Sequence, residues 1–461
     1  MKTQFPTLLL PILSLSLATG SPTTAREASK VGGPPLTFTV STDRPLIHRS
    51  ADPQEVVVRV DVTGLPRKGH SRVPLNLAVV LDRSGSMRGA KLEQAKQAAE
   101  MLVDRLGPDD IFSLVIYDTE VEVLVPPQRM GKRAESVRRQ IRQIEPGGST
   151  ALYAGVETGG RQLAEFFDEE RINRVLLLSD GIANVGPSSN RDIATLGQHL
   201  AREGRSVTTI GLGADYNEDL MTALAEASDA NFYHVADVEA LPDVFQRELG
   251  ELEQIIARKL VIEISFPDGI EPIEILGRPD AIQGRKGHIS FGTLSAEQAR
   301  EIFVTCRLDP SKAPKDAFAL ASAKLTYQDT TEAGTARDET IEAKATVKSV
   351  EDRDLANKAQ VNEITAQAEI YRNADATRRA VALADEGKGA EAKAAIDSQI
   401  IRLQTAAASA PAPVAKQLAE EIEVLDRSKD ELNEQGLSKE GRKALQWNVF
   451  QRSNSKPESG R

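Results

Sequence analysis

The chain has 461 residues, of which 40% are apolar and 27% are charged, and its formal net charge is −11 at pH 7. These values are typical of a soluble globular protein, and the length allows about two to four domains. The acidic excess argues against nucleic acid or an anionic membrane surface as the main partner. Acidic and basic residues are interspersed, so most of this charge indicates a solvated surface.

Residues 1–25 have the features of a secretory signal peptide. Lys2 supplies a positive charge, Leu8 to Ala18 form a short apolar core, and small residues that suit cleavage follow it. The alternative is a membrane anchor, but this core is too short to span a bilayer comfortably, and no later stretch is long and apolar enough. We expect an exported protein, periplasmic or extracellular, without a transmembrane segment in the mature chain.

Two β-rich blocks flank the centre of the chain. The first, 26–73, contains two runs rich in Val and Thr, and the second, 257–350, contains six more. Turn signals such as Pro-Asp-Gly at 267–269 separate the runs of the second block. Short strands at this spacing predict a β-sandwich. We interpret the two blocks as one domain that is interrupted by the central residues, and two separate pieces are the alternative.

The central residues, 74–256, alternate between strand and helix patterns. Strands are expected near residues 75–81, 111–117, 121–125, 174–178, 207–212 and 231–235, and helices near 88–106, 131–144, 151–168, 191–203, 218–227 and 239–256. This alternation predicts an α/β domain with a mostly parallel sheet and helices on both faces. Because few residues separate 111–117 from 121–125, these two strands must form a hairpin with one antiparallel edge strand.

The C-terminal part, 351–434, is rich in Ala, Glu, Lys and Gln and has apolar residues at helical spacing. Helices are expected over 353–373 and 375–405, with a possible break at 387–389, and helix resumes at 414–434. A helical hairpin or bundle packed on the β domain is one interpretation, and a partner-binding helical module is the other. The last residues, 435–461, are polar and are expected to be disordered, and docking of Leu445 to Phe450 on another part of the chain is the alternative.

Two strand ends of the central domain carry acidic and hydroxyl groups. The sequence Asp82-Arg83-Ser84-Gly85-Ser86 follows the apolar run 75–81, and Asp180 follows the run 175–178. Thr150 closes the turn Gly147-Gly148-Ser149-Thr150. Since ligands bind at the carboxyl ends of strands in an open α/β sheet, we expect these groups to converge there. Carboxylate and hydroxyl oxygens are the ligands that hard divalent cations such as Mg²⁺ or Mn²⁺ prefer.

At these residues the chain resembles the von Willebrand factor type A (VWA) domain. The metal-ion-dependent adhesion site (MIDAS) of that family has the pattern Asp-x-Ser-x-Ser, a distant Thr and a distant Asp. The matching residues in this chain are Asp82, Ser84, Ser86, Thr150 and Asp180. The resemblance covers roughly residues 74–250 and implies a Rossmann-like fold. The whole chain also resembles uncharacterised secreted bacterial proteins that combine this domain with β and helical segments.

The resemblance implies metal-dependent protein binding, in which an exposed Asp or Glu of a partner completes the coordination of the cation. It also implies that the two serines ligate directly, that Asp82 and Asp180 act directly or through water, and that Thr150 switches between the two. The alternative is a metal-free domain in which these side chains cap the following helix.

The residues favour binding over catalysis. Only two carboxylates offset the charge of a bound cation, because the other three expected ligands are neutral hydroxyls. The chain has no His-Glu-x-x-His motif, and its five histidines show no zinc spacing. We therefore expect an exported adhesion or assembly module and no enzyme. A metal-assisted hydrolase and a chaperone-like assembly subunit that use the same site are the alternatives.

Overall fold

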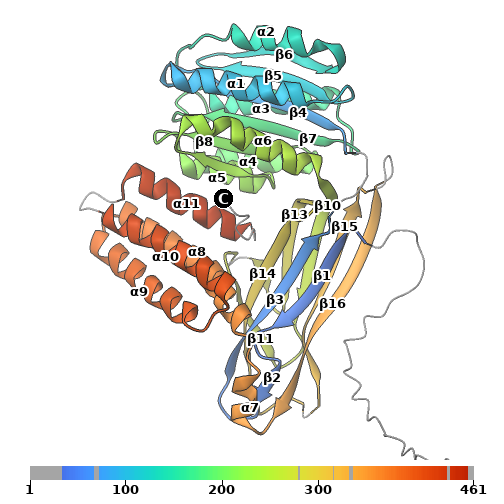
Figure 1. Cartoon of the computed structure of the whole chain (residues 1–461), viewed down its shortest axis with the longest axis vertical. Helices are drawn as coiled ribbons and strands as arrows, with labels where there is room; N and C mark the ends of the chain where they lie inside the picture. Colours follow the sequence, from blue (N-terminus) through green and yellow to red (C-terminus); the bar gives the residue numbers. More distant parts are fainter. Residues whose placement is uncertain are drawn as a thin grey trace, which may run out of the picture. The chain divides into compact units, whose positions relative to one another are not determined.

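The computed structural model describes residues 34–66, 72–278, 281–314, 316–331, 336–432 and 437–454. The expected signal peptide, 1–25, lies outside the described residues. Among the residues described, no helix combines the length and the apolar composition that a membrane crossing needs. The described residues form three sheets and a C-terminal group of helices (Figure 1).

The central sheet has six strands in the order β6-β5-β4-β7-β8-β9. Its strands are β4 (Leu75–Asp82), β5 (Ile111–Tyr117), β6 (Val121–Arg129), β7 (Ile172–Ser179), β8 (Ser206–Leu212) and β9 (Phe232–Val235). Neighbouring strands are parallel except β5 and β6, which form an antiparallel hairpin at one edge. The predicted mostly parallel α/β fold is therefore confirmed.

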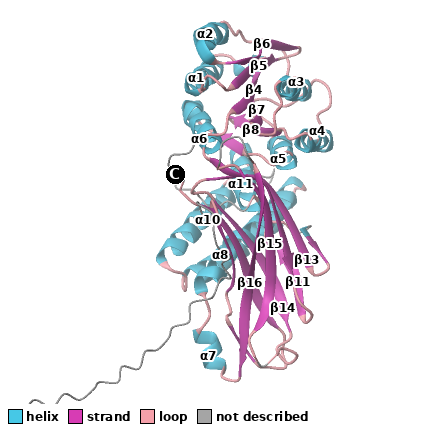
Figure 2. Cartoon of the chain, turned by 90° about the vertical axis from the view of Figure 1, so that its right-hand side faces the viewer, coloured by secondary structure: helices cyan, strands magenta, loops and turns pink. Residues whose placement is uncertain are grey.

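Six α-helices cover both faces of this sheet: α1 (Ala90–Arg105), α2 (Ala134–Arg142), α3 (Leu152–Glu165), α4 (Asn190–Arg202), α5 (Glu218–Ala227) and α6 (Leu241–Glu253). Successive residues of a strand point to opposite faces, and every residue of β4 is buried. Leu77 and Val79 of β4 belong to a core cluster with α1, α2 and α6. Ala78 and Val80 belong to a second cluster with α3, α4 and α5, and the two helix layers are visible in Figure 2.

Two further sheets contain residues from both sides of the central domain. One has the order β1-β3-β14-β11, and the other β12-β13-β10-β15-β16-β2. Their strands are β1 (Leu36–Thr42), β2 (Leu46–His48), β3 (Gln54–Gly64), β10 (Ile255–Ser265), β11 (Ile270–Ile275), β12 (Ile282–Gln283), β13 (Lys286–Ser295), β14 (Ala299–Leu308), β15 (Phe318–Asp329) and β16 (Arg337–Val350). Both sheets contribute to one apolar cluster.

The central domain leaves and re-enters this β structure between β3 and β10. Val60 of β3 lies opposite Ile302 of β14, although 242 positions separate them (302 minus 60). Ile255 at the start of β10 is buried in the core of the α/β domain, whereas the next residue, Ile256, belongs to the β core. The β strands before and after the central domain thus share one fold.

The C-terminal helices are α7 (Arg353–Lys358), α8 (Asn362–Asp385), α9 (Gly389–Ala407), α10 (Ala412–Asp430) and α11 (Lys439–Ser453). The expected boundary near residue 374 is wrong, because α8 runs through it with buried Ala and Thr side chains. The suggested break at 387–389 is the real boundary, where Gly387 adopts a φ of 75°. Tyr371 of α8 packs its ring on Phe303 of β14 at 4.8 Å between centroids.

The expectation of a disordered tail over 435–461 is wrong for residues 439–453, which form α11. Leu445, Val449 and Phe450 are buried, Leu445 in the core of the C-terminal helices and Phe450 in the core of the α/β domain. This burial agrees with the alternative that residues 445–450 dock on another part of the chain. Residues 435, 436 and 455–461 lie outside the described residues.

Candidate metal centre

Both predicted carboxylates lie at the same edge of the central sheet. Asp82 is the last residue of β4, and Asp180 directly follows β7. These strands are parallel neighbours in which Leu81 lies opposite Leu178, so their carboxyl ends meet. The side chains of both aspartates are fully buried. The short apolar strands therefore bring two carboxylates from distant parts of the chain to one point.

The two predicted serines lie in the loop between β4 and α1. Their Oγ atoms are 3.1 Å apart, and Ser86 Oγ donates a hydrogen bond of 2.7 Å to Asp180 Oδ1. This places the hydroxyl of Ser84 next to that of Ser86, which in turn contacts the carboxylate. The Gly85 N–H donates to the carbonyl of Gly148 at 2.9 Å, which ties this loop to the turn that carries the predicted threonine.

Thr150 closes the group from the loop before α3. A Cβ atom added to Gly181 would lie 3.3 Å from Thr150 Oγ1 and 3.4 Å from Ser86 Oγ. Both hydroxyls therefore border the small space that the missing side chain of Gly181 leaves. Asn184 Oδ1 accepts the N–H of Thr150 at 2.8 Å, so the loop after β7 holds the threonine in place.

Asp82 is held by hydrogen bonds at both of its carboxylate oxygens. Its Oδ1 accepts the Ser84 N–H at 2.8 Å, and its Oδ2 accepts the hydroxyl of Ser179 at 2.7 Å. Burial raises the pKa of Asp82, hydrogen bonds from Ser84 and Ser179 oppose the rise, and the charge of Asp180 adds to it. A nearby cation would favour the charged form of this carboxyl group.

Asp118, at the end of β5, connects two loops of the site. It accepts the N–H of Glu120 at 2.9 Å, which is a turn contact, and it forms an ion pair of 3.0 Å with Arg83. A Cβ atom on Gly147 would lie only 1.7 Å from Asp118 Oδ2, so only glycine fits at that position. Asp118 therefore acts both as a turn residue and as a support for the loop that contains Ser84.

The donor set suits a hard divalent cation. The five predicted residues, which we call the cation site, are linked through Ser86, which contacts Ser84 and Asp180 and borders Gly181 together with Thr150, and through the hydrogen bond from Ser84 to Asp82. Their side chains supply carboxylate and hydroxyl oxygens only. Asp82, Ser84, Ser86, Thr150 and Asp180 would hold Mg²⁺ or Mn²⁺ there. The site also contains a positive charge, because Lys91 Nζ lies 2.6 Å from Asp180 Oδ2.

Sequence reasoning missed three residues of this site: Lys91, Ser179 and Asn184. Ser179 is adjacent to a predicted ligand, but its strand position gave no sign that its hydroxyl points to Asp82. Asn184 carries no motif signal at all. Lys91 lies in the first turn of α1, where a basic residue is ordinarily read as solvated surface. Only the packing of α1 against the ends of the strands brings it to Asp180.

Residues 76–247 match the von Willebrand factor type A domain. Together with the sheet order, this match shows that residues 76–247 form a VWA domain with a Rossmann-like α/β fold. The remaining β and helical parts lie outside the matched residues.

Similar proteins include the uncharacterised protein sll0103 of Synechocystis sp., which is 26% identical over 262 residues, covering 55% of this chain and 61% of that protein. The uncharacterised protein YfbK of Escherichia coli is 26% identical over 215 residues, covering 46% of this chain and 37% of that protein. The chain thus spans less than two thirds of the length of either relative.

A solved structure, the von Willebrand factor type A protein from Catenulispora acidiphila, aligns with 92% of this chain and 98% of its own at a TM-score of 0.65 and 18% identity. This likeness concerns the fold alone, and it extends beyond the VWA domain to the β and helical parts.

Proposed function

We propose that the protein is an exported binding module whose VWA domain engages an acidic group of a partner through a divalent cation at the cation site. The observation that carries this proposal is the chain of contacts that joins two carboxylates and two serine hydroxyls at one sheet edge, with the hydroxyls of Ser86 and Thr150 both next to Gly181. Such a group resembles the MIDAS of the family that residues 76–247 match.

Each residue of the site has a distinct proposed role. Ser84 and Ser86 offer neutral oxygens as direct ligands, and Asp180 offers a carboxylate that already accepts from Ser86. Asp82 carries the second negative charge and orients the loop through the Ser84 N–H. Thr150 would contribute its hydroxyl from the opposite loop. When bound, the cation would supply an open position for a carboxylate oxygen of the partner.

We further propose binding in preference to catalysis. A metal-assisted hydrolase needs a general base next to the metal. Asp82 accepts from Ser84 and Ser179, and Asp180 accepts from Ser86 and pairs with Lys91, so both carboxylates are already engaged. A chaperone-like or assembly subunit would use the same site in the same way, and it is a biological variant of this function.

The preferred partner is a protein or peptide with an exposed Asp or Glu. A net charge of −11 gives the chain no general attraction for acidic molecules, so the cation would have to supply the local attraction. The proposed export depends on the charge of Lys2 and the apolar core from Leu8 to Ala18. Intact-mass analysis of the exported protein tests it, and a cytoplasmic chain that starts at Met1 would contradict it.

The proposed binding is tested by capture of partners from periplasm or culture medium with the immobilised chain. We expect a partner that is retained in Mg²⁺, released by EDTA and recaptured when Mg²⁺ is restored. Ser86→Ala should weaken its capture, whereas Ser311→Ala, a matched change in a turn of the β domain, should not. A retained partner that is indifferent to EDTA and to Ser86→Ala would contradict the proposal.

A further inference from the structure

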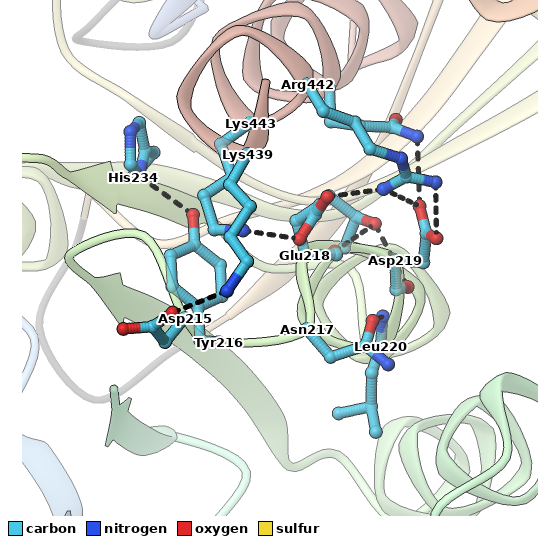
Figure 3. A network of polar contacts seen from close by, with 12 residues as sticks. Asp215, Tyr216, Asn217, Glu218, Asp219, Leu220, His234, Lys439, Arg442 and Lys443 are labelled. Carbon is cyan, nitrogen blue, oxygen red and sulfur yellow. Dashed lines mark hydrogen bonds and ion pairs between the residues drawn. The ribbon is translucent and has the colours of Figure 1, made fainter. Parts of the chain in front are cut away.

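The C-terminal helix α11 lies on the VWA domain through a dense set of charged contacts (Figure 3). Lys443 Nζ contacts Glu218 Oε2 of α5 at 2.8 Å and lies 4.8 Å from the centre of the Tyr216 ring. Arg442 pairs with Glu218 and contacts Asp219 at 2.8 Å. These contacts join residues that are more than 220 positions apart.

Apolar packing supports the same interface. The ring of Phe450 packs edge-on against Phe232 of β9 at 5.6 Å between centroids, and both side chains belong to the core of the VWA domain. Trp447, the single tryptophan of the chain, packs partly buried against that core. We use the name α11 interface for the contacts that α11 makes with α5, with the loop before α5 and with β9. Its residues on α11 are Lys439, Arg442, Lys443, Trp447 and Phe450.

The outer contact of the α11 interface differs from the inner ones. Lys439 Nζ lies 2.7 Å from Asp215 Oδ1, and the side chains are 68% and 64% exposed. The inner pair, Lys443 and Glu218, is 3% and 8% exposed. Because exposed ion pairs are weak and easily exchanged, Asp215 is the acidic group of this interface that can most readily change partner.

Lys91 approaches the same loop from the cation site. A Cβ atom added to Gly213 would lie 3.7 Å from Lys91 Nζ, and Gly213 is two residues before Asp215. The hydrogen bond and charge of Lys439 lower the pKa of Asp215, and the positive charge of Lys91 contributes in the same direction. Lys91 therefore lies within electrostatic reach of two carboxylates, one in the cation site and one at the α11 interface.

We propose that Lys91 couples occupancy of the cation site to the docking of α11. Without a cation, Lys91 neutralises Asp180. When Asp180 ligates a divalent cation, the cation repels the ammonium group of Lys91. Lys91 then shifts toward Asp215, where it competes with Lys439. This inference rests on the proposed function and adds to it a link between the cation site and the helical part.

Such a link is reciprocal, so a change at the α11 interface must alter the affinity of the cation site, and occupancy of the cation site must alter the docking of α11. Lys91→Met removes the competitor for Asp180 and should raise the affinity for Mn²⁺ about tenfold. Lys439→Gln leaves Asp215 available to pair with Lys91 and should raise the affinity for Mn²⁺ about twofold to fivefold. Asp215→Asn removes the receiving carboxylate and should lower the affinity by a similar factor.

The decisive feature is the combination of these changes. In a Lys91→Met background, Lys439→Gln and Asp215→Asn should lose most of their effect on Mn²⁺ affinity, because the coupling residue is gone. Lys429→Gln is the matched control, since Lys429 forms a similar ion pair of 2.6 Å with Asp397 on the helices and the charge change is identical. It should leave Mn²⁺ affinity unchanged in either background.

The experiment combines calorimetric titration of the full chain with Mn²⁺ and the emission of Trp447 during titration with Mg²⁺. We expect Mg²⁺ to shift the emission to longer wavelength in the unaltered chain and to have little effect in Lys91→Met. Should Lys91→Met fail to fold, Lys439→Gln, an exposed change, still tests the affinity.

The outcomes separate the two proposals. Mn²⁺ binding that is the same in the unaltered chain, Lys91→Met and Lys439→Gln would overturn the coupling and leave the proposed function intact. Binding of Mg²⁺ that leaves the Trp447 emission unchanged would also overturn the coupling and leave the proposed function intact. An unaltered chain that binds neither ion would overturn the proposed function and the coupling with it.

Discussion

The cation site and the α11 interface are both polar clusters on the VWA domain, and they are built in opposite ways. The cation site consists of small oxygen-bearing side chains on short loops, and it has one basic group, Lys91, near its two carboxylates. The α11 interface pairs long basic side chains of one helix with the acidic start of α5, and both signs of charge are present in near balance. The first arrangement leaves negative charge for a ligand, whereas the second largely satisfies its own charges.

This difference separates a binding site from a structural contact. A cluster whose charges compensate one another holds two parts of a chain together, and loss of one partner leaves a buried charge. A cluster with an excess of one charge gains most when an outside ion binds. We therefore expect changes at the buried inner contacts of the α11 interface to alter mainly stability, and changes at the cation site to alter mainly binding.

The largest effect on stability is expected for Glu218→Ala. Lys443 is buried and would lose its carboxylate partner, which should lower the free energy of unfolding by about 3 kcal/mol. Urea unfolding followed by circular dichroism measures the loss. The paired change Glu218→Gln with Lys443→Met should recover part of it, and an equal loss in the single and the paired variants would contradict this interpretation of the ion pair.

Gly181→Ala tests the cation site in the same way. The added methyl group would enter the space bordered by Thr150 Oγ1 and Ser86 Oγ, so Mn²⁺ affinity should fall about tenfold. Gly250→Ala is the control, because nothing lies within 4 Å of its added Cβ in α6. That control should leave the affinity unchanged and stabilise the fold by about 0.5–1 kcal/mol. Equal Mn²⁺ affinities in the two variants would show that the space is not the binding position.

Acidification should loosen the α11 interface in two stages. Burial and the charge of Lys443 lower the pKa of His234 from 6.5, so its contribution to stability is present above 6.5 and is lost below it, as the pH falls through the folded pKa. For Glu218, burial raises the pKa but the hydrogen bonds from Lys443 and Arg442 outweigh it, so the net pKa is below 4.5 and its contribution is lost only below that value.

The emission of Trp447 against pH checks this expectation. A small shift is expected below pH 6.5, and the larger shift below pH 4.5. A single transition above pH 6.5 would contradict the assignment of these two groups.

The smallest expected effect on cation binding is that of Thr150→Ala. If the hydroxyl of Thr150 ligates mainly when a partner is engaged, Mn²⁺ affinity should fall by less than about threefold while partner capture falls further. Its backbone N–H still donates to Asn184, so the loop should keep its position. Thr195→Ala, on the outer side of α4, should change neither quantity. A fall in Mn²⁺ affinity that equals the fall in capture would remove this special role.

The parts of the fold that were predicted are those with strong local patterns. The apolar runs 75–81 and 175–178 lie in buried parallel strands, and the ends of these strands therefore bring Asp82 and Asp180 together. The hairpin of β5 and β6 followed from loop length alone. The five residues of the cation site converge in space as the motif predicted, although their binding of metal stays a prediction.

The parts that were missed depend on contacts between distant residues. Lys91 looks like a surface lysine in the sequence, and only the packing of α1 places it on Asp180. Residues 439–453 look polar in the sequence because they contain many charged side chains. The sequence does not show that some of these charges pair with α5, which lies more than 200 positions earlier in the chain. A single sequence contains no signal for such pairs, so composition favoured disorder there.

The most direct test of the central claim is a calorimetric titration of the unaltered chain and of Asp82→Ala with Mn²⁺, with Asp309→Asn in a β-domain turn as the matched loss of a carboxylate. The unaltered chain and Asp309→Asn should bind Mn²⁺ equally, and binding to Asp82→Ala should fall by about a hundredfold or more, since one of only two charges is lost. Unchanged Mn²⁺ binding in Asp82→Ala would contradict the assignment of the site.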